Sequence, residues 1–149
     1  SAVVDDPPSP GDALEAAVRA LRARDHTAAS LDARLARRGV AEDRRVDAVS
    51  RLQELGYVDD ARLAHARAEA LAARGAGDLL IAHDLERQGV PSTLAAEAIA
   101  TLGPERDRAA TIVARRGAGP KTARFLASKG FAEDVVEAAV ATPDREALG

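Results

Sequence analysis

The sequence contains no cysteine, and aromatic residues make up only 2% of its 149 positions. The missing cysteines exclude disulfides, thiolate metal sites and cysteine nucleophiles. No apolar run approaches the roughly 20 residues that cross a bilayer, and the acidic, Pro-rich start "SAVVDDPPSPGD" differs from a signal peptide. We therefore expect a cytoplasmic protein that does not enter a membrane.

Alanine, in contrast to the aromatic residues, is abundant and accounts for 36 of the 149 residues. Alanine is the best helix former because its side chain loses no entropy on ordering, whereas strands favour β-branched and aromatic residues. The composition therefore predicts an all-α protein.

One pattern occurs three times, in residues 31–49, 80–99 and 122–140. Each copy has a leucine, then a glycine four residues later, an apolar residue directly after the glycine and another nine residues further on. The leucine–glycine pairs are Leu35/Gly39, Leu85/Gly89 and Leu126/Gly130. Helices often end on a left-handed glycine, with the next apolar residue packed on the last turn. Valine at Gly89 should therefore destabilise the fold.

A further helical segment precedes each copy, which gives three helices per repeat. The apolar positions predicted to share a face are Leu14, Ala17, Val18 and Leu21 in the first segment, Leu63, Ala66, Ala70 and Leu71 in the second, and Ala109, Ile112 and Val113 in the third. "RGAG" at 74–77 and again at 116–119 marks the turn into the next helix. A glycine-rich phosphate loop is the alternative interpretation, but it requires a preceding strand.

The predicted architecture is three tandem three-helix repeats in an elongated, curved arrangement, because each repeat needs its neighbours to bury its small apolar face. The boundaries are a flexible acidic, Pro-rich tail at 1–12, repeats at 13–56, 57–103 and 104–141, and a C-terminal tail at 142–149.

The adjacent carboxylates Asp59 and Asp60 follow the only tyrosine, Tyr57. Neighbouring acids at a helix start do not face each other across a cleft, so we expect Asp59 to be the N-cap and Asp60 to be favoured by the helix dipole. A partner contact or acid–base and metal chemistry are the alternatives. We expect Tyr57 to pack between the first two repeats, or to be partly exposed as interface tyrosines are.

Basic residues form clusters although the net charge is −3. Residues 13–58 and 104–141 each carry a net charge of +2, whereas residues 59–103 carry −3. Such clusters are often only exposed to solvent, but they also bind phosphates. The scarcity of aromatic residues argues against recognition of unpaired bases by stacking. The candidate partner or DNA-phosphate contacts are Arg34, Arg37, Arg38, Arg74, Arg115, Arg116, Lys121, Arg124 and Lys129.

No pattern of catalytic or metal-binding residues is present. His26, His65 and His83 have no zinc-binding spacing, and no "GxSxG" nucleophile motif occurs. We expect neither enzymatic activity nor a cofactor or metal.

Four segments carry a resemblance: "RDHTAASLDARLARRGV", "RLQELGYVDDARLA", "GAGDLLIAHDLERQGV" and "GAGPKTARFLASKGF". Together they resemble the RecX family, which regulates the recombinase RecA. The most specific is "LGYVDDARLA", in which the resemblance implies a structural junction motif formed by Gly56, Tyr57, Asp59, Asp60 and Arg62. The chain departs from the family in "DLLI" at 78–81, where basic residues are common, and in Leu63, where an aromatic residue is common.

The resemblance implies a non-catalytic regulator, mainly an inhibitor, that binds the RecA–single-stranded DNA filament. We expect the chain to be a monomer. It would reduce ATP hydrolysis, strand exchange and co-protease activity, and so modulate recombinational repair and the SOS response. Weak binding to single- or double-stranded DNA is also implied. The alternatives are a stand-alone helical DNA-binding protein that competes for single strands, and a scaffold for another protein. A transcription-factor recognition helix fits three tandem units poorly.

Overall fold

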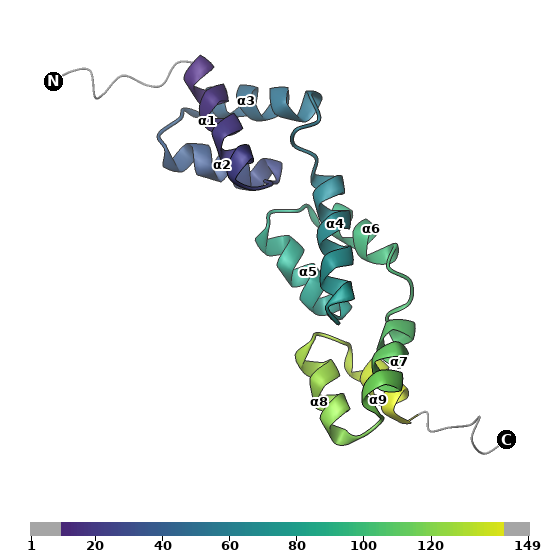
Figure 1. Ribbon diagram of the computed structural model, residues 1–149. Helices are drawn as coiled ribbons and strands as arrows, with labels where there is room; N and C mark the ends of the chain where they lie inside the picture. The colour runs from purple at the N-terminus through teal and green to yellow at the C-terminus, as the bar shows by residue number, and fades with distance from the viewer. Residues whose placement is uncertain (1–9, 142–149) are drawn as a thin grey trace. The chain divides into compact units, whose positions relative to one another are not determined.

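The computed structural model describes residues 10–141, and this part of the chain contains nine α-helices and no strand (Figure 1). The predicted tails lie outside the described range, except that residues 10–12 form the start of the first helix. None of the described helices is long and apolar enough to span a membrane. The helices are α1 Pro10–Ala23, α2 Ala28–Arg37, α3 Glu42–Glu54, α4 Asp60–Ala73, α5 Asp78–Arg87, α6 Ser92–Ala100, α7 Glu105–Arg116, α8 Pro120–Ser128 and α9 Glu133–Ala141.

The middle helix of each repeat is followed by a glycine that turns the chain into the third helix. Gly39, Gly89 and Gly130 have φ angles of +83°, +87° and +84°, a region that costs residues with a Cβ atom free energy. The next residue closes the turn, since the amide of Val40 donates to the carbonyl of Leu35 at 3.1 Å. The leucine and the apolar residue directly after the glycine lie in the core in each copy: Leu35, Leu85, Leu126, Val40, Val90 and Phe131 are all at most 5% exposed. Of the second apolar residues, Val49 is buried, whereas Ile99 and Val140 are only partly buried.

The described residues form two compact units. Unit 1 comprises residues 10–63 and the loop 88–91, and unit 2 comprises residues 64–87 and 92–141. In unit 1, α1 packs on α2 and α3. The core of this unit contains Ala13, Ala17, Ala20, Leu31, Leu35, Val40, Ala48, Val49, Leu52 and Val58.

The buried side of a first helix is formed by alanine. In α1, Ala13, Ala17 and Ala20 are buried, whereas Leu14, Val18 and Leu21 pack only partly buried at the edge of the core. In α4 the predicted face was wrong: Ala64 and Ala68 are fully buried, whereas Ala66 and Ala70 are exposed. Because alanine side chains are small, an alanine face lets a neighbouring helix approach closely and can form the buried side. When alanine lies on every side of a helix, the spacing of apolar residues does not identify that side.

The α7 face is as predicted, because Ala109 is buried and Ile112 and Val113 pack against it. Ala109 belongs to a cluster in unit 2 with Leu126, Phe131 and Val136. In this cluster a phenylalanine takes the place that valine has in the other two copies of the repeat.

In unit 1, the start of α2 contacts two other segments. The hydroxyl of Thr27, the N-cap of α2, donates to the carbonyl of Gln88 at 2.6 Å and accepts from the amide of Ser30 at 3.0 Å. The amide of Ala28 donates to Asp60 Oδ1 at 2.8 Å. The first amides of a helix lack partners within the helix, and here Asp60 satisfies one of them.

In unit 2, the start of α5 makes contacts at the same positions. The amide of Gly77 donates to the carbonyl of Lys129 at 2.7 Å, and the amide of Asp78 donates to Glu105 Oε1 at 3.0 Å. Gly77 has to be glycine, because a Cβ atom there would lie 2.5 Å from the amide nitrogen of Phe131.

The start of α8 differs from the starts of α2 and α5. Its first residue is Pro120, preceded by Gly119 in an extended conformation. Proline is favoured at this position because its ring presets the helical φ and its missing N–H needs no partner. The N–H groups that Ala28 and Asp78 offer therefore have no counterpart in the third repeat.

Candidate nucleic-acid and partner interface

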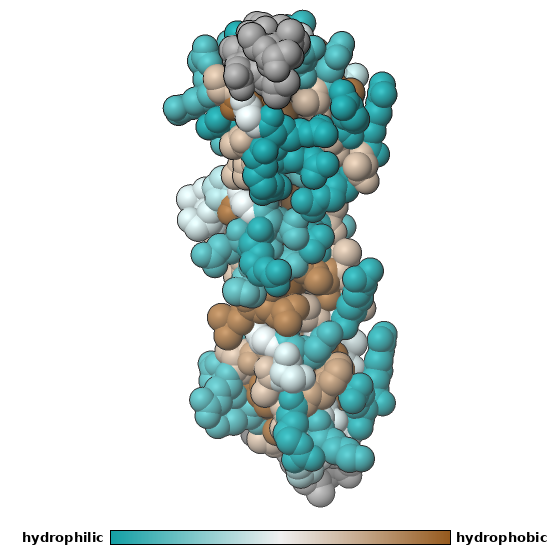
Figure 2. All heavy atoms as spheres, turned by 90° about the vertical axis from the view of Figure 1, so that its left-hand side faces the viewer, coloured by the Kyte–Doolittle hydropathy of each residue, from teal (hydrophilic) through white to brown (hydrophobic). Residues whose placement is uncertain are grey.

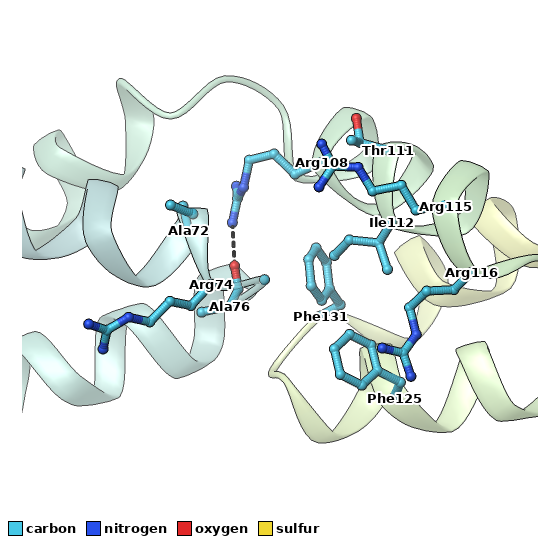
Figure 3. A pocket seen from close by; sticks show the side chains of 12 residues that line it. Ala72, Arg74, Ala76, Arg108, Thr111, Ile112, Arg115, Arg116, Phe125 and Phe131 are labelled. Carbon is cyan, nitrogen blue, oxygen red and sulfur yellow. Dashed lines mark hydrogen bonds between the residues drawn. The ribbon is translucent and has the colours of Figure 1, made fainter.

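A pocket of about 480 Å³ lies in unit 2, on the side where the end of α4 faces α7 and α8 (Figure 3). It brings together three of the predicted contact residues, Arg74, Arg115 and Arg116. Its lining is arginine, phenylalanine and small or aliphatic side chains: Ala72, Ala73, Arg74, Gly75, Ala76, Arg108, Thr111, Ile112, Arg115, Arg116, Phe125 and Phe131.

Local structure explains why these residues meet. Arg115 and Arg116 occupy the last turn of α7, where the negative end of the helix dipole favours positive charge. Arg74 follows α4, and Gly75, with φ +91°, turns the chain there. A Cβ atom at Gly75 would lie 3.8–3.9 Å from side-chain atoms of Lys129, Ile112 and Phe125, so this turn lies directly against the pocket.

Aromatic rings form part of the wall, and cations lie over them. The guanidinium carbon of Arg116 is 3.8 Å from the ring centroid of Phe125, and Lys129 Nζ is 6.0 Å from the same centroid. The guanidinium carbon of Arg108 is 5.9 Å from the centroid of Phe131, whose side chain is almost completely buried. Both phenylalanines of the chain therefore lie at this one pocket.

Among the arginines of the pocket, Arg108 is the one whose guanidinium is fixed by hydrogen bonds to other residues of unit 2. It donates through Nη1 to Asp78 Oδ1 at 2.8 Å and through Nη2 to the carbonyl of Ala76 at 3.0 Å, the bond drawn in Figure 3. Its Nε is buried without a hydrogen-bond partner among the described atoms. Arg108 thus joins α7 to the start of α5 and places a fixed positive charge in the wall.

The other arginines of the pocket keep their charge available. In the described part of the chain, no carboxylate pairs with Arg74, Arg115 or Arg116. Figure 3 shows Arg115 and Arg116 extending from α7, with Arg116 ending over Phe125, while the guanidinium of Arg74 points away from the two rings. An uncompensated positive cluster beside an aromatic surface is suited to an anion that also carries a flat apolar group.

Lys129 lies beside the pocket, over Phe125, and the other predicted contact residues lie elsewhere. Lys121 and Arg124 are exposed on α8 and do not line the pocket. Arg34, Arg37 and Arg38 are exposed at the end of α2 in unit 1. Much of the surface drawn in Figure 2 is hydrophilic, and a hydrophobic patch interrupts it.

The segment 56–62 has a structural role in unit 1. The amide of Arg62 donates to Asp59 Oδ1 at 3.0 Å, so Asp59 caps α4, and the guanidinium of Arg62 donates to the carbonyl of Gly56 at 3.0 Å. Of the two expectations for Tyr57, exposure is the one the structure shows: the residue is 65% exposed, and the neighbouring Val58 enters the core instead.

His26 is a buried titratable group in unit 1. It is 4% exposed, and its Nδ1 lies 3.0 Å from Ser30 Oγ. Burial, and to a smaller extent the charges of Arg24 and Arg34, lower the pKa of His26 below its ordinary value of 6.5. Among the described residues, no group of three or more His, Asp and Glu side chains is placed to hold a metal ion.

Sequence reasoning missed Arg108 and Phe125. A signal for Phe125 was present, since Phe125 and Lys129 are four residues apart and therefore share a helix face with a predicted contact residue. No signal pointed to Arg108, because its partners Asp78 and Ala76 lie some 30 residues away in sequence.

Comparisons with known proteins agree with this architecture. Residues 59–99 match the family model described as RecX, second three-helix domain. The protein named Regulatory protein RecX from Halorhodospira halophila is 32% identical over 142 residues, which cover 89% of this chain and 88% of the relative. The protein of the same name from Chromohalobacter salexigens is 34% identical over 134 residues, covering 84% and 88%.

A solved structure has the same fold. The crystal structure of RecX from Lactobacillus salivarius superposes with a TM-score of 0.74 at 18% identity and covers 88% of this chain and 94% of that one. With the repeat pattern, the helix order and two relatives above 30% identity over most of their length, the chain belongs to the RecX family.

Proposed function

We propose that this chain regulates RecA, mainly as an inhibitor, by binding along the RecA–single-stranded DNA filament. In that role it reduces ATP hydrolysis, strand exchange and co-protease activity and so modulates recombinational repair and the SOS response. The proposal rests on family membership, because the relatives are named regulatory proteins. The observation that carries it within this chain is the set of exposed arginines without a carboxylate partner.

In the proposed mechanism, the protein binds the filament and catalyses no reaction. The exposed basic residues at the end of α2 and on α8 supply charge to a negatively charged filament surface, which raises the association rate and gives a salt-dependent affinity. Each unit offers such a group: Arg34, Arg37 and Arg38 in unit 1, and Lys121 and Arg124 in unit 2.

ATP hydrolysis by preassembled RecA filaments, titrated with this protein at physiological salt, tests the proposal. Inhibition below the ratio at which the protein would coat the DNA indicates action on the filament. Reversing the charge of Arg34, Arg37 and Arg38 together, or of Lys121 and Arg124 together, should weaken inhibition while helicity stays unchanged. Arg106→Glu is a control, because Arg106 is exposed and lies outside the proposed contact set.

No inhibition by the folded parent at any ratio would refute the filament proposal. Inhibition that disappears when DNA is added in excess over RecA would favour the alternative, a stand-alone protein that competes for single strands. Equal inhibition by the charge-reversed variants would show that the two basic groups are not the contact surface.

A further inference from the structure

We infer that the pocket of unit 2 binds one nucleotide unit of a single-stranded nucleic acid, with the base against the Arg116–Phe125 pair and the phosphate on Arg115. This goes beyond the filament proposal, because it names one pocket and the residues in it that would hold the base and the phosphate. The contents of the pocket support it in three respects: charge, a flat apolar surface, and size.

Charge comes first. Four arginines line the pocket, and Arg108 is the one whose charge is matched by a carboxylate, that of Asp78, within the described residues. The end of α7 therefore presents two uncompensated guanidinium groups, those of Arg115 and Arg116, at the cavity, while the guanidinium of Arg74 points away from the rings. Guanidinium groups bind phosphate with paired, charge-assisted hydrogen bonds, so an anionic ligand of this kind is favoured.

The flat apolar surface is the second feature. The guanidinium carbon of Arg116 lies over Phe125, 3.8 Å from the ring centroid, so an arginine and an aromatic ring meet at one place in the wall. Bases of unpaired nucleic acids stack on aromatic rings and on arginine planes. Ile112 and the alanines at the end of α4 complete an apolar lining that an acidic peptide would leave without a matching group.

Size and access are the third feature. A cavity of about 480 Å³ falls within the usual range for small-ligand sites, which is roughly 300–1,000 Å³. The bases of a duplex are paired and stacked on both faces, so they cannot enter a pocket lined on several sides. The pocket therefore selects unpaired nucleotides, either within a strand or free in solution.

Binding of a fluorescent oligothymidine of about 10 nucleotides, measured by anisotropy without RecA at low salt, tests the inference. Phe125→Leu keeps an apolar side chain and removes the ring, and Arg116→Gln removes the guanidinium. Each is expected to weaken binding about tenfold, since stacking of one base contributes a factor of this order. Arg115→Gln should lower the salt dependence by about 0.7 in the log–log slope, the value for one phosphate contact with a single strand.

Arg106→Gln is the matched control, because it removes the same charge from the same helix. Arg106 and Arg115 are nine residues apart, which at 3.6 residues per turn places them on opposite faces of α7. Binding by Arg106→Gln should stay within about twofold of the parent, as expected for a charge that only adds to the general field. Equal losses in Arg106→Gln and Arg116→Gln would overturn the inference.

Competition experiments separate the sources of the ligand. Displacement by unlabelled single strand, but not by an equal length of duplex, supports the strand site, and displacement by thymidine monophosphate supports a site for free nucleotides with the same chemistry. Displacement by polyglutamate as effective as by the single strand would overturn the inference. Because RecA is absent, the result is independent of the filament assay.

A crosslink covers the case in which Phe125→Leu does not fold. A strand carrying a photoreactive base is irradiated with the parent protein, and the adduct is located by mass spectrometry. Adducts within residues 115–125 support the pocket, and adducts confined to unit 1 would overturn it.

Discussion

The contacts at the start of α2 in unit 1 and at the start of α5 in unit 2 are here called the two junctions. They occupy the same positions in the repeat but use different hydrogen-bonding groups. At the start of α2, a threonine hydroxyl donates to the carbonyl of Gln88, whereas at the start of α5 the backbone amide of Gly77 donates to the carbonyl of Lys129. In both, a carboxylate from the first residue of a later helix, Asp60 or Glu105, accepts the first amide of the helix.

The junctions also differ three residues after that carboxylate. Unit 2 has Arg108, which bonds Asp78 and the carbonyl of Ala76, and unit 1 has Leu63 at the corresponding position. The two junctions therefore share one requirement, a partner for an otherwise unpaired helix amide, while the side chains that fill the rest of the space vary.

The largest expected effect comes from adding one methyl group to the helix-end glycines. A Cβ atom at Gly130 would lie 2.6 Å from the backbone nitrogen of Leu80, and at Gly89 it would lie 2.8 Å from the Thr27 hydroxyl. At Gly39, no described atom beyond the glycine and its two neighbours in the chain would lie within 4 Å of it. Alanine should lower the free energy of unfolding by about 1 kcal/mol at Gly39, about 2 at Gly89 and more than about 3 at Gly130.

Urea denaturation followed by circular dichroism measures this series. Equal losses at all three positions would mean that only the left-handed backbone matters and that the two junctions are not tightly packed. Valine at Gly89 should be worse than alanine, because β-branching adds strain at positive φ.

The next effect is expected for Arg108→Leu, which gives the unit 2 junction the residue that unit 1 has. The change leaves the carbonyl of Ala76 and the carboxylate of Asp78 without their partner. The free energy of unfolding should fall by about 2 kcal/mol, a value reduced for the partial exposure of Asp78. Arg106→Leu is the control and should change stability by less than about 0.5 kcal/mol. A neutral Arg108→Leu would show that the ion pair adds nothing to this junction.

A smaller effect is expected for the junction carboxylate of unit 1. Asp60→Ala should lower the free energy of unfolding by about 1 kcal/mol, because the amide of Ala28 loses its acceptor. Asp60→Asn retains an oxygen and should recover most of the loss. Thermal unfolding at one pH compares the two, and equal loss in both would mean that the negative charge, rather than the hydrogen bond, stabilises the junction.

The smallest expected effect depends on pH and is confined to unit 1. The pKa of folded His26 lies below 6.5, so the unfolded chain binds more protons as the pH falls through this value. The contribution of His26 is thus fully present above pH 6.5 and is lost as the pH falls from there toward the folded pKa. Arg24, Arg34 and Arg37 act in the same direction as burial, and Asp25 opposes them.

Hydrogen exchange of α2 and α5 at neutral and mildly acidic pH checks the sign. Amides of α2 should lose protection on acidification relative to those of α5, and His26→Gln should remove most of the difference. Greater protection of α2 at the lower pH would contradict the assigned direction of the shift.

The sequence predicted the helical class and the helix-end glycines, because both depend on residues close together in the chain. Leu35, Gly39 and Val40 form one turn, so their spacing reports directly on local structure. The buried face of α4 and the packing of Tyr57 were not predictable in this way. Alanine on every side of α4 gives periodicity little contrast, and Val58, next to Tyr57, competes for the same core position.

The candidate site was predictable only in part. Arg74, Arg115 and Arg116 were identified as basic residues near glycine turns, but their meeting at one pocket depends on the fold placing residues 72–76 beside α7. The stacking of Arg116 on Phe125 joins residues nine positions apart on two helices. A low content of aromatic residues does not exclude an aromatic surface, because the fold brings both phenylalanines to the same pocket.

Pro120 has a consequence for how copies of this chain could associate. A chain built of similar repeats risks polymerisation, since a repeat of one copy can offer a second copy the surface that a neighbouring repeat normally covers. The junctions inside the chain need an N–H at the first position of the middle helix, and Pro120 has none. A second copy placed against α8 by the same geometry would lack the bond that Asp60 and Glu105 form, so this one ring disfavours growth into a fibre through the third repeat.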